Sequence, residues 1–358
     1  MHYTVQNGDT LWLVGQKFKQ NYRAIAMANA IEPPYLVYPG QVLHIPRSHR
    51  LIGFIPDYAS SEGIADALKA PEPFNEVVYT FMRVQPDGSV QVGPVDSRIQ
   101  VLRTRMTRVL VGLSNQSEAA YSRKAADSAL LEGDSRSRLA ASAVSVAVSN
   151  AFDGVHLDFQ EIEAAHWDGA AELLCEIRAR FSQLSPYYTT SVSIPSNWCE
   201  KPFDLKRTAE CTDLMIMEGY EKGASHSEGP LAPLPWLKQT VSSAIAEVGP
   251  ARLVVTLGIY GLDWSPKGDT AYITSEAAQQ TATETSAQID RDQTSGTPRF
   301  HYEDASGVTH QVWYEDLDSL SMKMQLLESL GVRKIAIWRL GSVPMEIIHA
   351  VCEARTWA

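Results

Sequence analysis

From residue 51 onward, the chain alternates short apolar runs with longer stretches that carry apolar residues at helical spacing. Runs rich in Val, Ile and Leu are typical of parallel strands covered on both sides. Helices are expected between them, among others over 135–150 and 167–184. Repeated strand–helix units predict an α/β fold, a TIM (β/α)8 barrel over residues 51–358. The predicted strands lie at 51–55, 76–81, 108–113, 152–161, 188–194, 214–217, 253–259 and 334–338.

Residues 263–312 depart from this pattern, because the segment is polar. We expect a helix over about 275–287 and then a hairpin, with strands at 300–302 and 308–312 joined by the turn 304–307. The segment is therefore predicted to be a small α+β insertion in the barrel.

A smaller unit precedes the barrel. Asp9 or Thr10 can cap its first helix, and Pro33 cannot continue its second. The order βααβ predicts a separate module over residues 1–47, which residues 48–50 link to the barrel over 51–358. The predicted elements of the module are a strand at 3–5, a helix ending near residue 18, a helix at 22–29 and a strand at 42–46.

The stretch 152–161 combines strand alternation with reactive side chains. His156, Asp158 and Gln160 are expected to share one face of the strand, because side chains alternate between faces. Gly154 lets the chain enter this strand closely packed. Polar side chains at the end of an apolar strand in an α/β pattern indicate a functional site.

This stretch resembles the signature of glycoside hydrolase family 18, Asp-Gly-apolar-Asp-apolar-Asp-aromatic-Glu on the fourth strand of a (β/α)8 barrel. His156 stands where the family has Asp or Asn, and Gln160 stands where it has the catalytic Glu. The resemblance implies retaining hydrolysis in which the substrate's own 2-acetamido group is the nucleophile. The matching residues are Asp153, Gly154, Asp158 and Phe159.

The resemblance also implies roles for the residues at the strand ends. Asp158 would hold the acetamido nitrogen, and Tyr220 would hold the acetamido oxygen, while Glu218 and Gly219 displace the tyrosine from its usual place after the sixth strand. Trp338 would be the floor of subsite −1. The implied catalytic set is Gln160 (proton-donor position), Asp158, Tyr220 and Asp153, and the implied substrate-binding set is Trp338, Tyr79 and His156.

Gln160 decides what the site can do. A carboxamide keeps the shape of a carboxylic acid but cannot act as a general acid. Glu161 is expected to point away from the pocket, because adjacent strand residues face opposite sides. Either an isosteric Glu-to-Gln change has silenced an enzyme, or the chain is a natural glycan-binding relative that lost catalysis. Because the rest of the predicted pocket is intact, we favour the silenced enzyme.

The N-terminal module resembles a LysM domain across its whole length, through residues 3–5, 8–12, 28–29 and 38–46. LysM domains bind glycans that contain N-acetylglucosamine in a shallow groove between two loops. The residues implied to line this groove are Gly8, Asp9, Thr10 and Leu11 on one side and Ala30, Ile31, Glu32 and Pro33 on the other.

Charge and composition exclude several functions. The net charge of −11 and the lack of a Lys/Arg run argue against nucleic acid and anionic membrane as partners. No apolar run is long enough for a membrane span, and because residues 1–3 run directly into the module we expect no signal segment in this sequence. The cysteines are spaced neither as metal ligands nor as a disulfide framework, so reduced thiols, no metal and no cofactor are expected. They are Cys175, Cys199, Cys211 and Cys352.

A LysM unit joined to this barrel resembles bacterial cell-wall N-acetylglucosaminidases of the spore-cortex-lytic type, which can lack a signal peptide. The resemblance implies peptidoglycan as the glycan partner and the spore coat, cortex or cell wall as the location. A chitinase is the alternative, since chitin carries the same 2-acetamido group. A purely glycan-binding protein is the third hypothesis.

Overall fold

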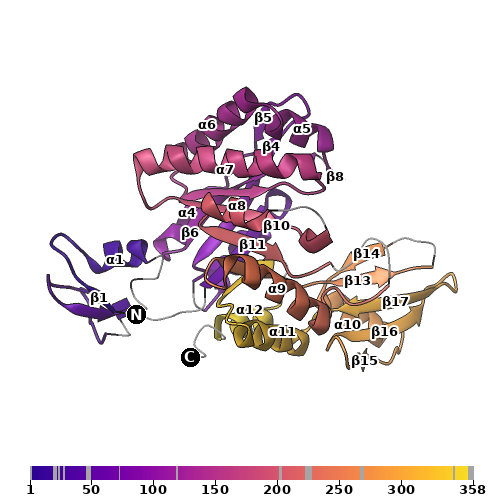
Figure 1. Ribbon diagram of the computed structural model, residues 1–358. Coiled ribbons are helices and arrows are strands. Elements are labelled where there is room, and N and C mark those ends of the chain that lie inside the picture. Colours follow the sequence, from indigo (N-terminus) through magenta and orange to yellow (C-terminus); the bar gives the residue numbers. More distant parts are fainter. Residues whose placement is uncertain are drawn as a thin grey trace.

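The computed structural model describes residues 2–353, apart from 19–21, 23–24, 27–28, 46–49, 72, 118–119, 201–203, 222–227, 267–269 and 342. Its largest part is a closed barrel of parallel strands, which confirms the predicted TIM barrel (Figure 1). The first strand pairs with both the second and the last, and this closes the barrel. The barrel strands are β3 Arg50–Pro56, β4 Glu76–Val84, β6 Arg108–Ser114, β9 Gly154–Asp158, β10 Thr189–Ile194, β11 Leu214–Glu218, β12 Leu253–Gly258 and β18 Lys334–Trp338.

Alternation along the strands divides the barrel core into two layers. One set of side chains fills the barrel interior, including Phe54, Val78 and Ile216, with Trp338 packed against it. The other set points outward and packs against the helices. These outer elements are η1 Asp57–Ala59, α3 Ser60–Lys69, α4 Ile99–Thr104, α5 Arg123–Leu130, α6 Gly133–Ser149, α7 Ala164–Leu184, η2 Trp198–Glu200, α8 Leu205–Glu210, α9 Leu234–Val248, α11 Leu317–Ser329 and α12 Met345–Glu353.

Buried charges close the amino-terminal end of the barrel. Glu76, at the start of β4, forms ion pairs with Arg50 and Arg108, which begin the two neighbouring strands. Burial lowers the pKa of Arg50, although the adjacent Glu76 carboxylate opposes that shift. Arg108 also donates hydrogen bonds to the carbonyl oxygens of Asp153 and Tyr187. The cluster therefore ties β3, β4 and β6 to the loops that precede β9 and β10.

The insertion forms its own antiparallel sheet in the order β14-β13-β17-β16-β15. Figure 1 shows it at one edge of the barrel, beside α9 and α11. One face is covered by α10, whose Ala278 and Ala282 pack against Phe300. The elements are β13 Gly261–Trp264, β14 Thr270–Ile273, α10 Ser275–Glu284, β15 Asp290–Arg291, β16 Pro298–Glu303 and β17 Thr309–Tyr314. Three further short strands, β5 Val90–Val92, β7 Gln116–Ser117 and β8 Ala120–Tyr121, lie near β4 and β6.

The N-terminal module has a sheet of β1 His2–Thr4 and β2 Val42–His44, with α1 Leu11–Lys17 packed on it. Its separate core includes Val5, Leu11, Val14, Ile25 and Leu43. The predicted second helix, 22–29, lies partly outside the described residues; of its described members, 22, 25 and 26 are helical and 29 is in a turn. Residues 48 and 49 of the predicted linker also lie outside them. Among the described residues, no helix is both long and apolar enough to cross a membrane.

One prediction about the cysteines is wrong. Cys175 in α7 and Cys211, just after α8, form a disulfide with their Cα atoms 4.7 Å apart. Among the described residues, neither the exposed Cys199 nor the buried Cys352 is part of a disulfide. The pair could not be recognised from sequence, because two helices separated by a strand bring the thiols together across 36 residues.

Candidate active site

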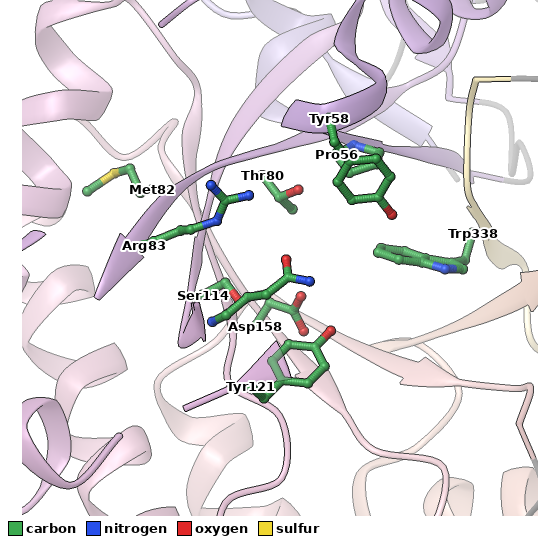
Figure 2. Close-up of a pocket in the computed structure, with 10 residues that line it drawn as sticks. Pro56, Tyr58, Thr80, Met82, Arg83, Ser114, Tyr121, Asp158 and Trp338 are labelled. Carbon is green, nitrogen blue, oxygen red and sulfur yellow. The ribbon is translucent and has the colours of Figure 1, made fainter. Parts of the chain in front are cut away.

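A pocket opens at the carboxyl ends of the barrel strands, the end where TIM barrels place their active sites. In Figure 2, Tyr58 and Trp338 lie on one side of Asp158 and Arg83 lies on the other. Arg83 is held by an ion pair with Asp57, 2.7 Å long. The lining residues come from the ends of β3, β4, β6, β9 and β18 and from η1, β7 and β8. They are Pro56, Tyr58, Thr80, Met82, Arg83, Ser114, Gln116, Tyr121, Asp158 and Trp338.

The strand that carries Asp158 fits closely against its neighbour. A Cβ atom on Gly154 would lie 2.0 Å from the Thr189 carbonyl oxygen on β10, so only glycine fits there. Alternation then turns His156 and Asp158 into the barrel interior. The two ring nitrogens of His156 each lie 3.0 Å from a hydroxyl oxygen, that of Ser191 or Ser193. Burial lowers the pKa of His156 to about 3, so the ring is neutral beneath Asp158.

Gln160 lies between two carboxyl groups. Its Nε2 donates to Asp158 Oδ1 at 2.8 Å and to Glu218 Oε1 at 2.6 Å. Asn115 fixes the backbone of Gln160, because its side chain accepts from the Gln160 N–H and donates to the Gln160 carbonyl, each at 2.9 Å. Both protons of the amide are thereby used on carboxyl oxygens.

Glu218 ends β11 and faces the barrel interior, on the same side of the strand as Leu214 and Ile216. Its other oxygen accepts from the Ser196 N–H at 3.3 Å. Burial, followed by the charges of Asp158 and Glu221, raises the pKa of Glu218 to about 8. Burial also raises the pKa of Asp158, while hydrogen bonds from Gln160 and Ser193 oppose that shift. Near neutral pH the site therefore holds Glu218 mainly as the neutral acid.

Aromatic rings complete the wall of the site. Tyr220 is buried, and its ring lies nearly parallel to that of Trp338, with centroids 6.5 Å apart. The hydroxyl of Tyr260 donates to Glu221. Tyr121 projects from β8 toward Asp158 (Figure 2), and burial together with the charges of Asp158 and Glu218 raises its pKa. The ring of Trp338 therefore lies in the same site as the polar groups of β9 and β11.

Residues 50–342 match the family model Glycosyl hydrolases family 18, and residues 3–46 match the LysM domain. The chain belongs to glycosyl hydrolase family 18. It carries a LysM domain before the family 18 barrel, in the order that the two resemblances predicted.

Several known proteins match most of this chain. The chain is 26% identical to the cortical fragment-lytic enzyme of Bacillus subtilis (strain 168) over 298 residues. The matched region covers 78% of this chain and 68% of the relative. The spore cortex-lytic enzyme SleL of Bacillus megaterium QM B1551 matches 99% of this chain and 86% of its own, with a TM-score of 0.75 and 23% identity. The match to the structure of a chitinase from Chromobacterium violaceum ATCC 12472 covers 87% of this chain and 100% of the chitinase chain, with a TM-score of 0.77 and 20% identity. The chain is therefore a family 18 glycosidase related to spore cortex-lytic enzymes.

Several of the predicted site residues are brought together. Asp158 and Trp338 line the pocket, Gln160 bonds to Asp158, and Tyr220 lies against Trp338. His156 supports the site from beneath and does not line the pocket. Glu161 is exposed at the surface, with its backbone at φ 54°.

Two predicted residues lie elsewhere. Tyr79 is in the outer layer, stacked on Phe81, with its hydroxyl donating to the Pro94 carbonyl at 3.3 Å. The prediction misjudged which residues of β4 face inward, since Val78 and Thr80 do so. Asp153 lies at the opposite end of β9, where its carboxylate accepts from the Val109 N–H at 2.8 Å. Its contacts are structural and do not involve the pocket.

Sequence reasoning missed Glu218 and Tyr121 as parts of the site. In the sequence, Glu218 was noted only because Glu218 and Gly219 shift Tyr220 from the place where the family has its tyrosine. Its own alternation with Leu214 and Ile216 could have placed it in the barrel mouth. Tyr121 lies on a two-residue strand that follows β6, and no periodicity marks so short an element.

The predicted glycan-binding loops of the LysM domain are built around turns. Thr10 caps α1 by accepting from the Leu13 N–H, and Asp9 accepts from the Tyr3 hydroxyl at 2.5 Å. Leu11 is buried in the core of the module. In the second loop Ala30 has φ 52°, and Glu32 and Pro33 are exposed. Both loops therefore contain exposed residues, which are Gly8 and Thr10 in the first and Ala30, Glu32 and Pro33 in the second.

Proposed function

We propose that the barrel is built for retaining, substrate-assisted hydrolysis of N-acetylglucosamine linkages in peptidoglycan, with spore cortex fragments as the substrate. We also propose that this chain is an inactivated form, because Gln160 replaces the usual proton donor. The observation that carries this proposal is the position of Asp158, a buried carboxyl at the end of β9 in a pocket that Trp338 also lines. The relationship to a cortical fragment-lytic enzyme supports the choice of substrate.

In the proposed reaction, the sugar of subsite −1 lies against the ring of Trp338. Its acetamido N–H donates to the Asp158 carboxylate, and the Tyr220 hydroxyl donates to the acetamido oxygen. That oxygen attacks C1 as the glycosidic bond breaks, and Asp158 stabilises the positive oxazolinium that forms. Water then attacks C1 from the face opposite the oxazolinium ring and opens that ring. The product therefore keeps the configuration of the substrate.

Gln160 limits this chemistry. General acid catalysis contributes about 10²–10⁴-fold, and an amide cannot supply it. The chain as it stands should therefore bind glycans and cleave them very slowly. Binding should survive, because the donor acts chiefly in the transition state.

The LysM domain is proposed to hold the same polymer through its two loops, at residues 8–11 and 30–33. A second attachment point raises the effective concentration of the barrel on insoluble glycan. This role places the protein in the spore coat, the cortex or the cell wall, with peptidoglycan as its partner.

Two other functions are each supported by one observation. The barrel superposes on a chitinase, and chitin offers the same 2-acetamido group. A glycan-binding protein without catalysis is favoured by the engagement of both Gln160 amide protons.

Digestion of purified spore cortex, vegetative peptidoglycan and chitin by the Gln160→Glu protein separates these functions. We expect cortex fragments to release N-acetylglucosamine ends fastest. Faster release from chitin would favour the chitinase. No release from any of the three glycans would favour the binding protein.

A further inference from the structure

The hydrogen bond between Gln160 and Glu218 places a carboxyl group next to the position where family 18 has its acid. Glu218 Oε1 is 2.6 Å from Gln160 Nε2, so a leaving oxygen in contact with the end of Gln160 lies within a side-chain rotation of Glu218. The site thus still contains two carboxyl groups and one amide, with Glu218 on β11 in place of an acid after β9.

The surroundings of Glu218 keep its proton in place. It is faced by Asp158 from β9, by Glu221 and Tyr220 after β11, by Tyr121 from β8 and by Tyr260 after β12. All of these groups are acidic or neutral, and His156 beneath them is uncharged. Burial among such neighbours disfavours a second negative charge, and a general acid needs this property.

We propose that Glu218 is the proton donor for the slow cleavage that this chain retains, a role that rests on the proposed substrate-assisted reaction. The carboxylic proton of Glu218 passes to the glycosidic oxygen while the C1–O bond breaks and the acetamido oxygen bonds to C1. Water then attacks C1 and gives a proton to the Glu218 carboxylate. The oxazolinium opens, the acetamide is restored, and the acid is ready for another turnover.

Other candidates for the acid fit less well. Glu161 is exposed at the surface, so burial does not hold its proton in place as it does for Glu218. Burial and the nearby carboxylates hold the Tyr121 proton too tightly for donation. Asp158 must remain a carboxylate to hold the acetamido N–H and balance the oxazolinium.

The test compares two leaving groups on the same sugar. From a 2,4-dinitrophenyl N-acetylglucosaminide the leaving group is dinitrophenolate, a stable anion that needs no proton. In a cortex fragment the leaving group is a sugar oxygen, which must be protonated. We expect Glu218→Gln to lower kcat/KM on cortex fragments by about tenfold, a part of the 10²–10⁴-fold that a well-placed acid supplies, and to leave dinitrophenyl release almost unchanged. The matched control, Glu161→Gln, should leave both rates unchanged. The unaltered chain should cleave cortex fragments more slowly as the pH rises through about 8, because Glu218 then loses its proton. Dinitrophenyl release should not show this fall.

A second comparison separates a catalytic from a structural role. In the Gln160→Glu background, the usual acid is restored, so Glu218→Gln should cost far less than it does in the unaltered chain. The doubly changed protein simply exchanges the amide and the carboxyl across the same hydrogen bond. A structural role would give the same loss in both backgrounds and on both substrates.

The possible failures are distinguishable. If no variant releases dinitrophenolate, the substrate-assisted function itself is wrong. If dinitrophenolate is released, the function stands, and three results would each overturn the role of Glu218. These are unchanged fragment cleavage by Glu218→Gln, no fragment cleavage by the unaltered chain above background, and equal losses in both backgrounds.

Discussion

Gln160 Nε2 donates to Glu218 Oε1 at 2.6 Å, so the amide at the family's donor position is bonded directly to a carboxyl group from another strand. The same amide holds Asp158 at 2.8 Å. One side chain thus joins β9 to β11 across the mouth of the barrel. A carboxyl group therefore lies one hydrogen bond away from the family's donor position.

Restoring the usual acid should increase turnover. We expect Gln160→Glu to raise kcat on cortex fragments by about 10–10³-fold, the part of general acid catalysis that Glu218 does not supply, with little change in KM, because the acid acts in the transition state. The product should form first as the anomer with the configuration of the substrate, which proton NMR during the first turnovers can identify. Initial formation of the inverted anomer would contradict the substrate-assisted reaction.

The two residues assigned to the acetamido group should be needed for that activity. In the Gln160→Glu background, Asp158→Asn and Tyr220→Phe should each lower kcat far more than they raise KM, because both residues stabilise the oxazolinium-like state. Tyr79→Phe is the matched control, since its hydroxyl bonds to the Pro94 carbonyl away from the pocket. A loss with Tyr79→Phe as large as that with Tyr220→Phe would argue against the assignment.

The buried charge cluster at the other end of the barrel should be important for stability. Glu76→Gln leaves Arg50 and Arg108 buried without their carboxylate, so the free energy of unfolding should fall by about 3–5 kcal/mol. Urea denaturation can measure this change. Glu247→Gln removes the 3.1 Å pair with Lys206, both side chains being largely exposed, and should cost no more than about 1 kcal/mol. Equal effects of the two substitutions would contradict the stabilising role of the cluster.

The LysM domain should matter only for large substrates. Removing residues 1–47 from the Gln160→Glu protein should weaken binding to insoluble wall material and leave cleavage of short soluble fragments almost unchanged. The reason is that only a polymer can reach two attachment points at once. Pull-down on cortex and kinetics on fragments measure the two effects. An equal loss in both assays would mean that the module supports the barrel itself.

The barrel could be predicted because its strands are apolar runs in a regular order, and the signature around Asp158 placed the site on one of them. Tyr79 was misplaced for a related reason. In a strand that is apolar on both faces, the residues themselves do not show which face is interior. The Cys175–Cys211 bridge and the Gln160–Glu218 bond were missed because they join residues 36 and 58 positions apart, and packing alone determines such contacts.

The central claim is that the pocket is complete apart from its usual acid. Calorimetry at low temperature, with intact cortex fragments and the unaltered chain beside its Gln160→Glu form, tests it most directly. Since Gln160 keeps the shape of the side chain and Asp158, Tyr220 and Trp338 are all present, both proteins should bind with similar affinity. Clear binding by the Gln160→Glu form and none by the unaltered chain would contradict the claim.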